Sequence, residues 1–111
     1  MPKTAAGFVK DLTGLKRSNN QAAMLAYLQN IPVAQIEAYF KRTEVESETL
    51  SLILEIVEQG VTTKDECIWA ANFLLSLAKA DNFELTISFA EDSDKTRIQK
   101  IFSKVRAAAE A

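Results

Sequence analysis

The residues that most often perform chemistry in proteins are scarce in this chain. Its 111 residues contain no histidine, which removes the commonest general base and metal ligand. The one cysteine, Cys67, opens an apolar segment. There a thiol is either a small core residue or, if a helix N-terminus lowers its pKa, the nucleophile of a thiol-dependent enzyme. We favour the core residue, and replacing Cys67 with alanine or serine separates the two interpretations.

The other residues that could form a catalytic or binding site show no spacing that would bring them together. Glu44, Glu46 and Glu48 precede an apolar stripe, which is typical of a helix start whose carboxylates match the helix dipole. The three glycines are isolated, so the chain lacks a phosphate-binding loop. We therefore predict no enzyme activity, no cofactor and no metal site.

Composition and charge narrow the class of protein further. With 48% hydrophobic and 25% charged residues, the chain is expected to fold as one domain over residues 1–111. A net charge of −2 argues against nucleic-acid binding, which needs a concentrated basic surface. No apolar run approaches the roughly 20 residues that a membrane-spanning helix needs. The basic residues before position 18 also resemble an organellar presequence, an interpretation that we place second to a structural helix.

Apolar residues recur at helical spacing through most of the chain, and polar residues mark where helices begin. The densest apolar segment, residues 67–89, holds the only tryptophan and is expected to form the centre of the fold. Its first half is apolar nearly all round, which predicts a helix covered on every side. The expected helices run from about 4 to 15, from 20 to 29, from 32 to near Arg42, from 46 or 47 to 60, from 63 to 79, from 82 to 89, and onward from 92 or 93.

The segment 83–89 gives two conflicting signals. It alternates strictly between apolar and polar residues, the pattern of a half-buried strand. A lone strand among helices has no partner, however, and residues 81–84 resemble a helix cap. We therefore predict a helix here, and an all-α fold: a compact bundle of about seven short helices without a sheet.

The last expected helix carries a row of cations. Arg97, Lys100 and Lys104 fall on one side of it, with Lys95 and Arg106 nearby. This row is either a solvated face near a helix C-terminus or a contact for an acidic protein surface.

Several segments resemble, in the same order, the C-terminal domain family of RNA polymerase II-associated protein 3, which also ends sperm-associated antigen 1. The similar segments are Pro2 to Ala5 with Phe8, YLQNIP at 27–32, the apolar helix from Val45 to Ile56, Leu77 to Phe83 with Phe89, and Ile101-Phe102. Their order and spacing together carry the resemblance.

The resemblance implies a non-catalytic binding module, the C-terminal domain of a longer heat-shock protein 90 co-chaperone. Such domains dock onto RuvB-like AAA+ ATPases, while tetratricopeptide repeats elsewhere in the parent hold heat-shock protein 90. The assembly builds RNA polymerase II, small nucleolar ribonucleoproteins, PI3-kinase-like kinases or axonemal dynein. The implied location is cytoplasmic, with the nucleus as a second one, and neither nucleic acid nor membrane is a direct partner.

The resemblance also places the partner contact at the start of the sixth expected helix. The residues expected to bind the partner are Asn82, Phe83, Leu85, Thr86 and Phe89. Asn82 stands where the family usually has arginine, and an amide cannot replace its charged, forked donor. The alternative is therefore a divergent helical scaffold or self-association domain that does not bind the ATPase.

Overall fold

Seven helices make up the regular structure of the described residues, and each begins close to where the sequence predicts. The structure is a computed structural model that describes residues 3–41 and 43–110, without the side chains of 108–110; Pro2 and Arg42 lie outside it. The helices are α1 (Ala5–Arg17), α2 (Gln21–Gln29), α3 (Val33–Phe40), α4 (Ser47–Gly60), α5 (Lys64–Leu77), α6 (Phe83–Ser88) and α7 (Asp92–Glu110). The prediction of an all-helical bundle without a sheet is confirmed over this part of the chain.

Polar side chains cap three of these helices. The side chains of Thr4, Asn20 and Thr63 accept hydrogen bonds from backbone N–H groups in the first turns of α1, α2 and α5. These bonds satisfy donors that have no partner within the helix. At α5 the bond is reciprocal, because Glu66 accepts in turn from the backbone N–H of Thr63, which completes the expected capping box.

The capping box predicts a pH dependence of stability. Hydrogen bonds from the backbone of Thr63, and then of Thr62, lower the pKa of the Glu66 carboxyl below its ordinary 4.5. A lowered pKa in the folded state stabilises the fold above pH 4.5, and this stabilisation is lost as the pH falls through the folded-state pKa. We therefore expect Glu66→Gln to lower the thermal midpoint at pH 7 but hardly at pH 2. Equal differences at both pH values would contradict the prediction; circular dichroism melts measure it.

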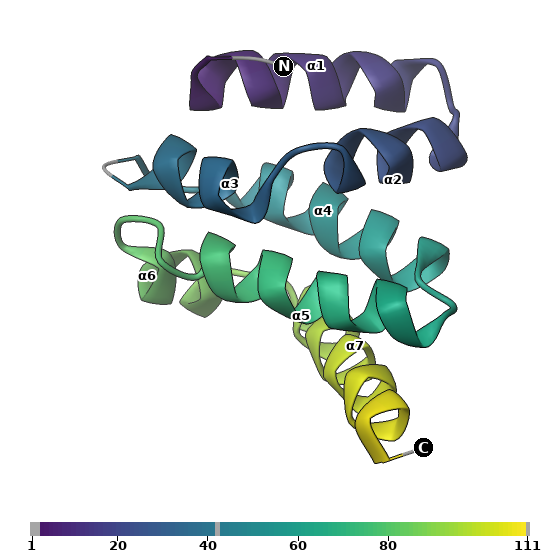
Figure 1. Ribbon diagram of the computed structural model, residues 1–111. Helices are drawn as coiled ribbons and strands as arrows, with labels where there is room; N and C mark the ends of the chain where they lie inside the picture. Colours follow the sequence, from purple (N-terminus) through teal and green to yellow (C-terminus); the bar gives the residue numbers. More distant parts are fainter. Residues whose placement is uncertain (1–2, 42, 111) are drawn as a thin grey trace.

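The helices stack in layers from one end of the molecule to the other (Figure 1). α1 lies on α2, α2 lies on α4, and α3 lies on α5. α7 crosses beneath the stack and contacts both α4 and α5. The short α6 lies beside the end of α5.

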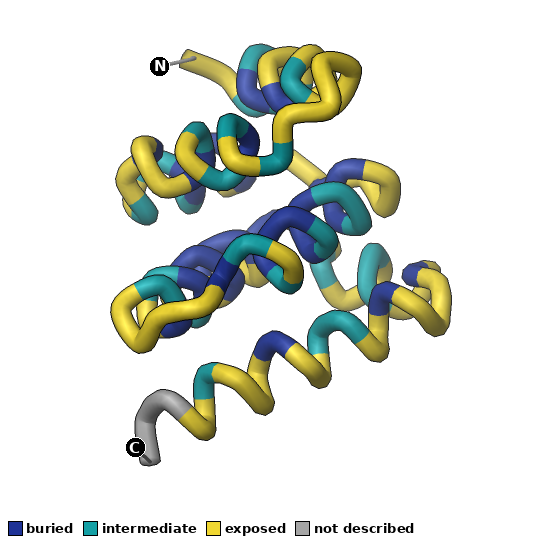
Figure 2. The backbone as a smooth tube through the Cα atoms, turned by 90° about the vertical axis from the view of Figure 1, so that its right-hand side faces the viewer, coloured by how far each residue is buried: buried dark blue, intermediate teal, exposed yellow. Residues whose placement is uncertain are grey.

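The core centres on α4 as much as on α5. α4 buries six residues, among them Ile53, Ile56 and Val57, and lies in the middle of the stack (Figure 2). The expectation that α5 is covered on every side is wrong, because Ile68 and Leu75 remain about half exposed or more. The physical reason is geometric: α7 crosses α5 instead of running along it, and α6 has only six residues with which to cover the rest.

The cationic row of α7 is tied to α4. Arg97 lies 3.1 Å from the Glu58 carboxylate and Lys100 lies 3.8 Å from it. Lys104 donates to the Glu58 backbone carbonyl at 2.9 Å. These three cations therefore fasten α7 to the end of α4, an arrangement that neither sequence interpretation anticipated.

Candidate protein-binding surface

The position of α6 is set by an unusual backbone conformation just before it. Asn82, at the N-cap, has a φ of 54° and so lies in the left-handed region. Asparagine tolerates this region better than most residues because its short polar side chain bonds locally or nearby. This turn at Asn82 changes the direction of the chain after α5 and begins α6.

Two hydrogen bonds then hold α6 against the segment that precedes α4. The Asn82 side-chain amide donates to the Glu44 carboxylate at 2.6 Å. The Thr86 hydroxyl donates to the backbone carbonyl of Val45 at 3.0 Å, and Val45 itself is buried. Both bonds join segments about 40 residues apart in sequence. Asn82 and Thr86 thus position α6 through an exposed bond to Glu44 and a partly buried bond to Val45.

α6 has two opposite apolar faces. Phe83 and Ile87, four residues apart, are partly buried and pack against the core. Leu85 and the C-cap residue Phe89, also four residues apart, point outward and are 56% and 79% exposed. Residues four apart share a face, whereas residues two apart lie about 200° away from each other. The alternating sequence therefore produces one apolar face for the core and one for the surface.

The outward face of α6 borders a shallow hollow of about 250 Å³, which we name the α6 hollow. Its lining consists of Glu44, Val45, Glu46, Ser47, Leu85, Thr86 and Phe89. Two carboxylates and no cation occur among these lining residues. The surface is thus an exposed leucine and phenylalanine beside negative charge.

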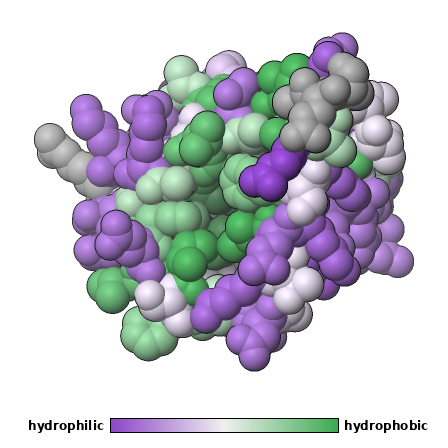
Figure 3. All heavy atoms as spheres, turned by 90° about the horizontal axis from the view of Figure 1, so that it is seen from below, coloured by the Kyte–Doolittle hydropathy of each residue, from purple (hydrophilic) through white to green (hydrophobic). Residues whose placement is uncertain are grey.

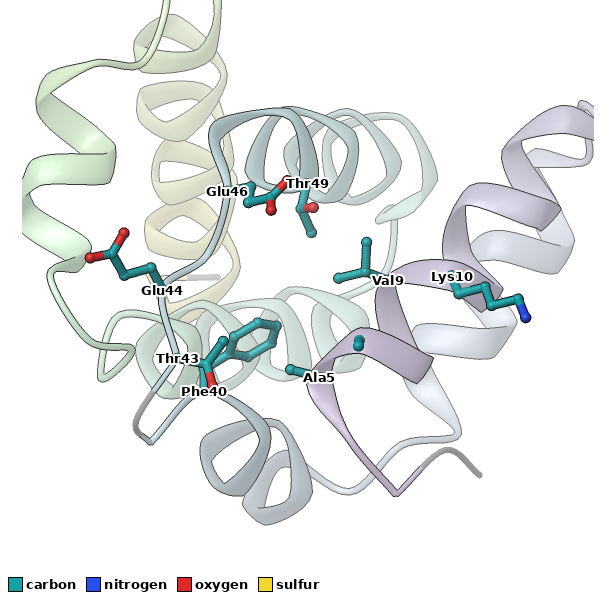
Figure 4. Close-up of a pocket in the computed structure, with 9 residues that line it drawn as sticks. Ala5, Val9, Lys10, Phe40, Thr43, Glu44, Glu46 and Thr49 are labelled. Atoms are coloured by element: carbon teal, nitrogen blue, oxygen red, sulfur yellow. The ribbon is translucent and has the colours of Figure 1, made fainter.

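A second hollow, of about 380 Å³, lies between α1, the loop after α3 and the start of α4 (Figure 4). Val9, Phe40 and Thr49 lie around it, while Lys10 and Glu44 point away from it. Its walls are mainly apolar, with Thr43, Glu46 and Thr49 as polar lining residues. Within the described part of the chain, His, Cys, Asp and Glu form no group of three that could hold a metal ion.

The structure brings together part of the predicted site. Leu85, Thr86 and Phe89 line the α6 hollow together, whereas Asn82 and Phe83 line a separate hollow, which Leu85 also borders. That Glu44 and Val45 support this helix could not be predicted from the sequence, because they lie far from it in the chain. Nor could the sequence show which half of the apolar residues in 83–89 would be exposed. Cys67 is buried in the core.

One comparison with known proteins identifies the family. The model of the family RPAP3_C, described as the potential Monad-binding region of RPAP3, matches residues 1–95. The match runs from α1 through α6 into the first turn of α7. Comparison with curated proteins and with solved structures finds no match. None of the described helices is both long and apolar enough to cross a membrane. Because the family model covers most of its length, the chain belongs to the RPAP3_C family.

Proposed function

We propose that this chain is a non-catalytic protein-binding domain that docks onto RuvB-like AAA+ ATPases within a heat-shock protein 90 co-chaperone. Its family is described as a potential binding region, which supports a binding role. The RuvB-like partner, the role in assembling large complexes and the cytoplasmic and nuclear location come from the family resemblance. Single-domain size and the capped, tightly packed helices suit a module that recruits a partner.

The observation that carries the proposal is the exposed pair on α6. Leu85 and Phe89 are 56% and 79% exposed, although α6 is firmly held by the Asn82 and Thr86 hydrogen bonds. An aromatic ring and a leucine on a rigid helix can enter a partner's pocket without ordering a flexible segment. α6 therefore supplies two anchors at little entropic cost.

The charge of the α6 hollow indicates what the partner offers there. Glu44 and Glu46 line it, and Glu84 lies one residue before Leu85. A partner that matches this surface presents an apolar socket with lysine or arginine at its edge. Because these carboxylates are exposed, added salt is expected to weaken the encounter.

The test is calorimetric titration of the domain into a purified RuvB-like hetero-oligomer. Phe89→Ala and Leu85→Ala are each expected to weaken binding by about tenfold or more, as loss of a buried anchor does. Phe83→Ala is a poorer probe, because Phe83 also packs against the core. Leu75→Ala is the matched control, since Leu75 is 59% exposed but lies on α5, outside the α6 hollow.

Two outcomes would contradict the proposal. The wild-type domain fails to bind the ATPase, or the Leu75 control weakens binding as much as the α6 variants do. Absence of ATPase binding together with a mass that rises with concentration in sedimentation would favour the self-association alternative. Monad, named in the description of the family, is titrated in parallel as a second candidate partner for the α6 hollow.

A further inference from the structure

A second apolar surface lies between α5, α6 and α7, away from the α6 hollow. It is a groove of about 100 Å³, which we name the α5–α7 groove. Its lining is apolar throughout: Leu50, Leu54, Leu74, Leu75, Ala78, Phe83, Ile87, Ile98 and Phe102. Figure 3 shows hydrophobic side chains gathered in the middle of this face, beside a diagonal band of hydrophilic ones.

The walls of the groove are more exposed than its floor. Leu50 and Leu54 of α4 form buried floor positions, whereas Leu75 of α5 is 59% exposed and Phe102 of α7 is 41% exposed. Ile68, two turns before Leu75 on the same face of α5, is also half exposed. The exposed apolar residues of α5 therefore extend about two helical turns, roughly 10 Å, from Leu75 to Ile68.

The cations of α7 divide between two faces. Arg97, Lys100 and Lys104 point to α4 and are held by Glu58. Lys95 lies seven residues before Phe102, and Arg106 lies four residues after it. These spacings place both cations on the same side of α7 as Phe102.

Lys95 and Arg106 present their charges on the Phe102 side of α7. Both are exposed, and neither takes part in an ion pair among the residues that the structure describes. Neither residue lines the groove itself; they flank it on the Phe102 side of α7 with two positive charges, opposite in sign to the carboxylates of the α6 hollow.

We propose that the α5–α7 groove docks an amphipathic helix of a partner protein whose apolar stripe is flanked by carboxylates. Helices recognised in this way insert apolar anchors at i, i+3 or i+4, and i+7 into a hydrophobic groove. Leu75 and Phe102 contact the stripe from either side, and Lys95 and Arg106 meet the flanking carboxylates. Of the lining residues, Ile98 and Phe102 lie outside the family match and the other seven lie within it. The site is distinct from the one proposed on α6 because neither Leu85 nor Phe89 lines the groove.

The experiment uses two designed peptides of about 18 residues with the same leucine stripe. One carries glutamate beside the stripe, and the other carries lysine at the same positions. Fluorescence anisotropy with the whole chain is expected to show the acidic peptide binding about tenfold more tightly than the basic one at low salt. Lys95→Glu with Arg106→Glu is expected to reverse this preference.

Variants and chemical-shift mapping locate the site. Phe102→Ala and Leu75→Ala are each expected to weaken binding of the acidic peptide by about tenfold, whereas Phe89→Ala on α6 leaves it unchanged. Amide shifts in nuclear magnetic resonance spectra are expected along α5 and α7 and not around Phe89. Circular dichroism confirms that each variant is folded.

Four results would overturn the proposal. The first is equal binding of the two peptides, which indicates non-specific apolar contact. The second is no binding of either peptide at up to about 1 mM. The third is loss of binding in Phe89→Ala. The fourth is a dimer of the chain that Phe102→Ala dissociates, which assigns the groove to a second copy instead.

Discussion

Replacing Phe8 with alanine is expected to lower the free energy of unfolding by about 3–5 kcal/mol. Phe8 has no exposed surface and lies at the centre of an aromatic cluster that joins α1 to α2 and α3. Its ring centroid is 6.1 Å from that of Tyr27, 5.7 Å from that of Tyr39 and 6.0 Å from that of Phe40. Aromatic pairs at such distances add stability beyond the area that they bury. Alanine would leave a cavity at the junction of three helices.

The loss is large because a domain of this size has about 5–15 kcal/mol of total stability. Urea unfolding followed by circular dichroism measures it, and the midpoint is expected to fall while the slope stays the same. Phe89→Ala is the matched control, because it makes the same chemical change at a side chain that is 79% exposed. It is expected to change stability by no more than about 0.5 kcal/mol. Similar losses from both variants would show that Phe8 is not packed as described.

Local sequence signals predicted the helices well, because capping is decided within one turn. Thr4, Asn20 and Thr63 each bond to a residue three positions later, so both partners are visible in one short segment. The only close competitor was a strand at 83–89. There the alternation comes from a helix with two apolar faces, and periodicity alone cannot separate that case from a half-buried strand.

The candidate sites were harder to predict, because they depend on contacts between distant segments. Asn82 is held by Glu44, 38 positions away, and Lys104 by Glu58, 46 positions away. Neither spacing has a pattern that a sequence displays. The central apolar helix also gave a misleading signal, since the residues that wrap it include Ile68 and Leu75, which the structure leaves exposed. Excess apolar surface on a core helix here marks a groove, and not additional burial.

Asp94 supplies the second large expected effect, because it is a carboxylate buried where α7 joins α4. It is 2% exposed, accepts a hydrogen bond from the Ser51 hydroxyl, and lies 3.4 Å from Arg97. Arg97 in turn reaches Glu58. Asp94→Ala removes the acceptor of the partly buried Ser51 hydroxyl and one of the two carboxylates that contact the Arg97 guanidinium. We expect it to lower the free energy of unfolding by about 1.5–3 kcal/mol, the range for hydrogen bonds to charged groups.

Two comparisons separate this network from the general effect of an acid near a helix start. Asp92 lies in the same first turn of α7 but is exposed, so Asp92→Ala is expected to cost no more than about 1 kcal/mol through the helix dipole. Ser51→Ala removes only the neutral donor and is expected to cost about 1 kcal/mol, less than the loss of Asp94. If Asp94→Ala is no more destabilising than Asp92→Ala, the buried bonds add nothing beyond the dipole. If Asp94→Ala is more destabilising than Asp92→Ala, α7 depends on Asp94 for its position. The acidic peptide is then expected to bind the Asp94 variant more weakly, because Ile98 and Phe102 would no longer form a fixed wall of the α5–α7 groove.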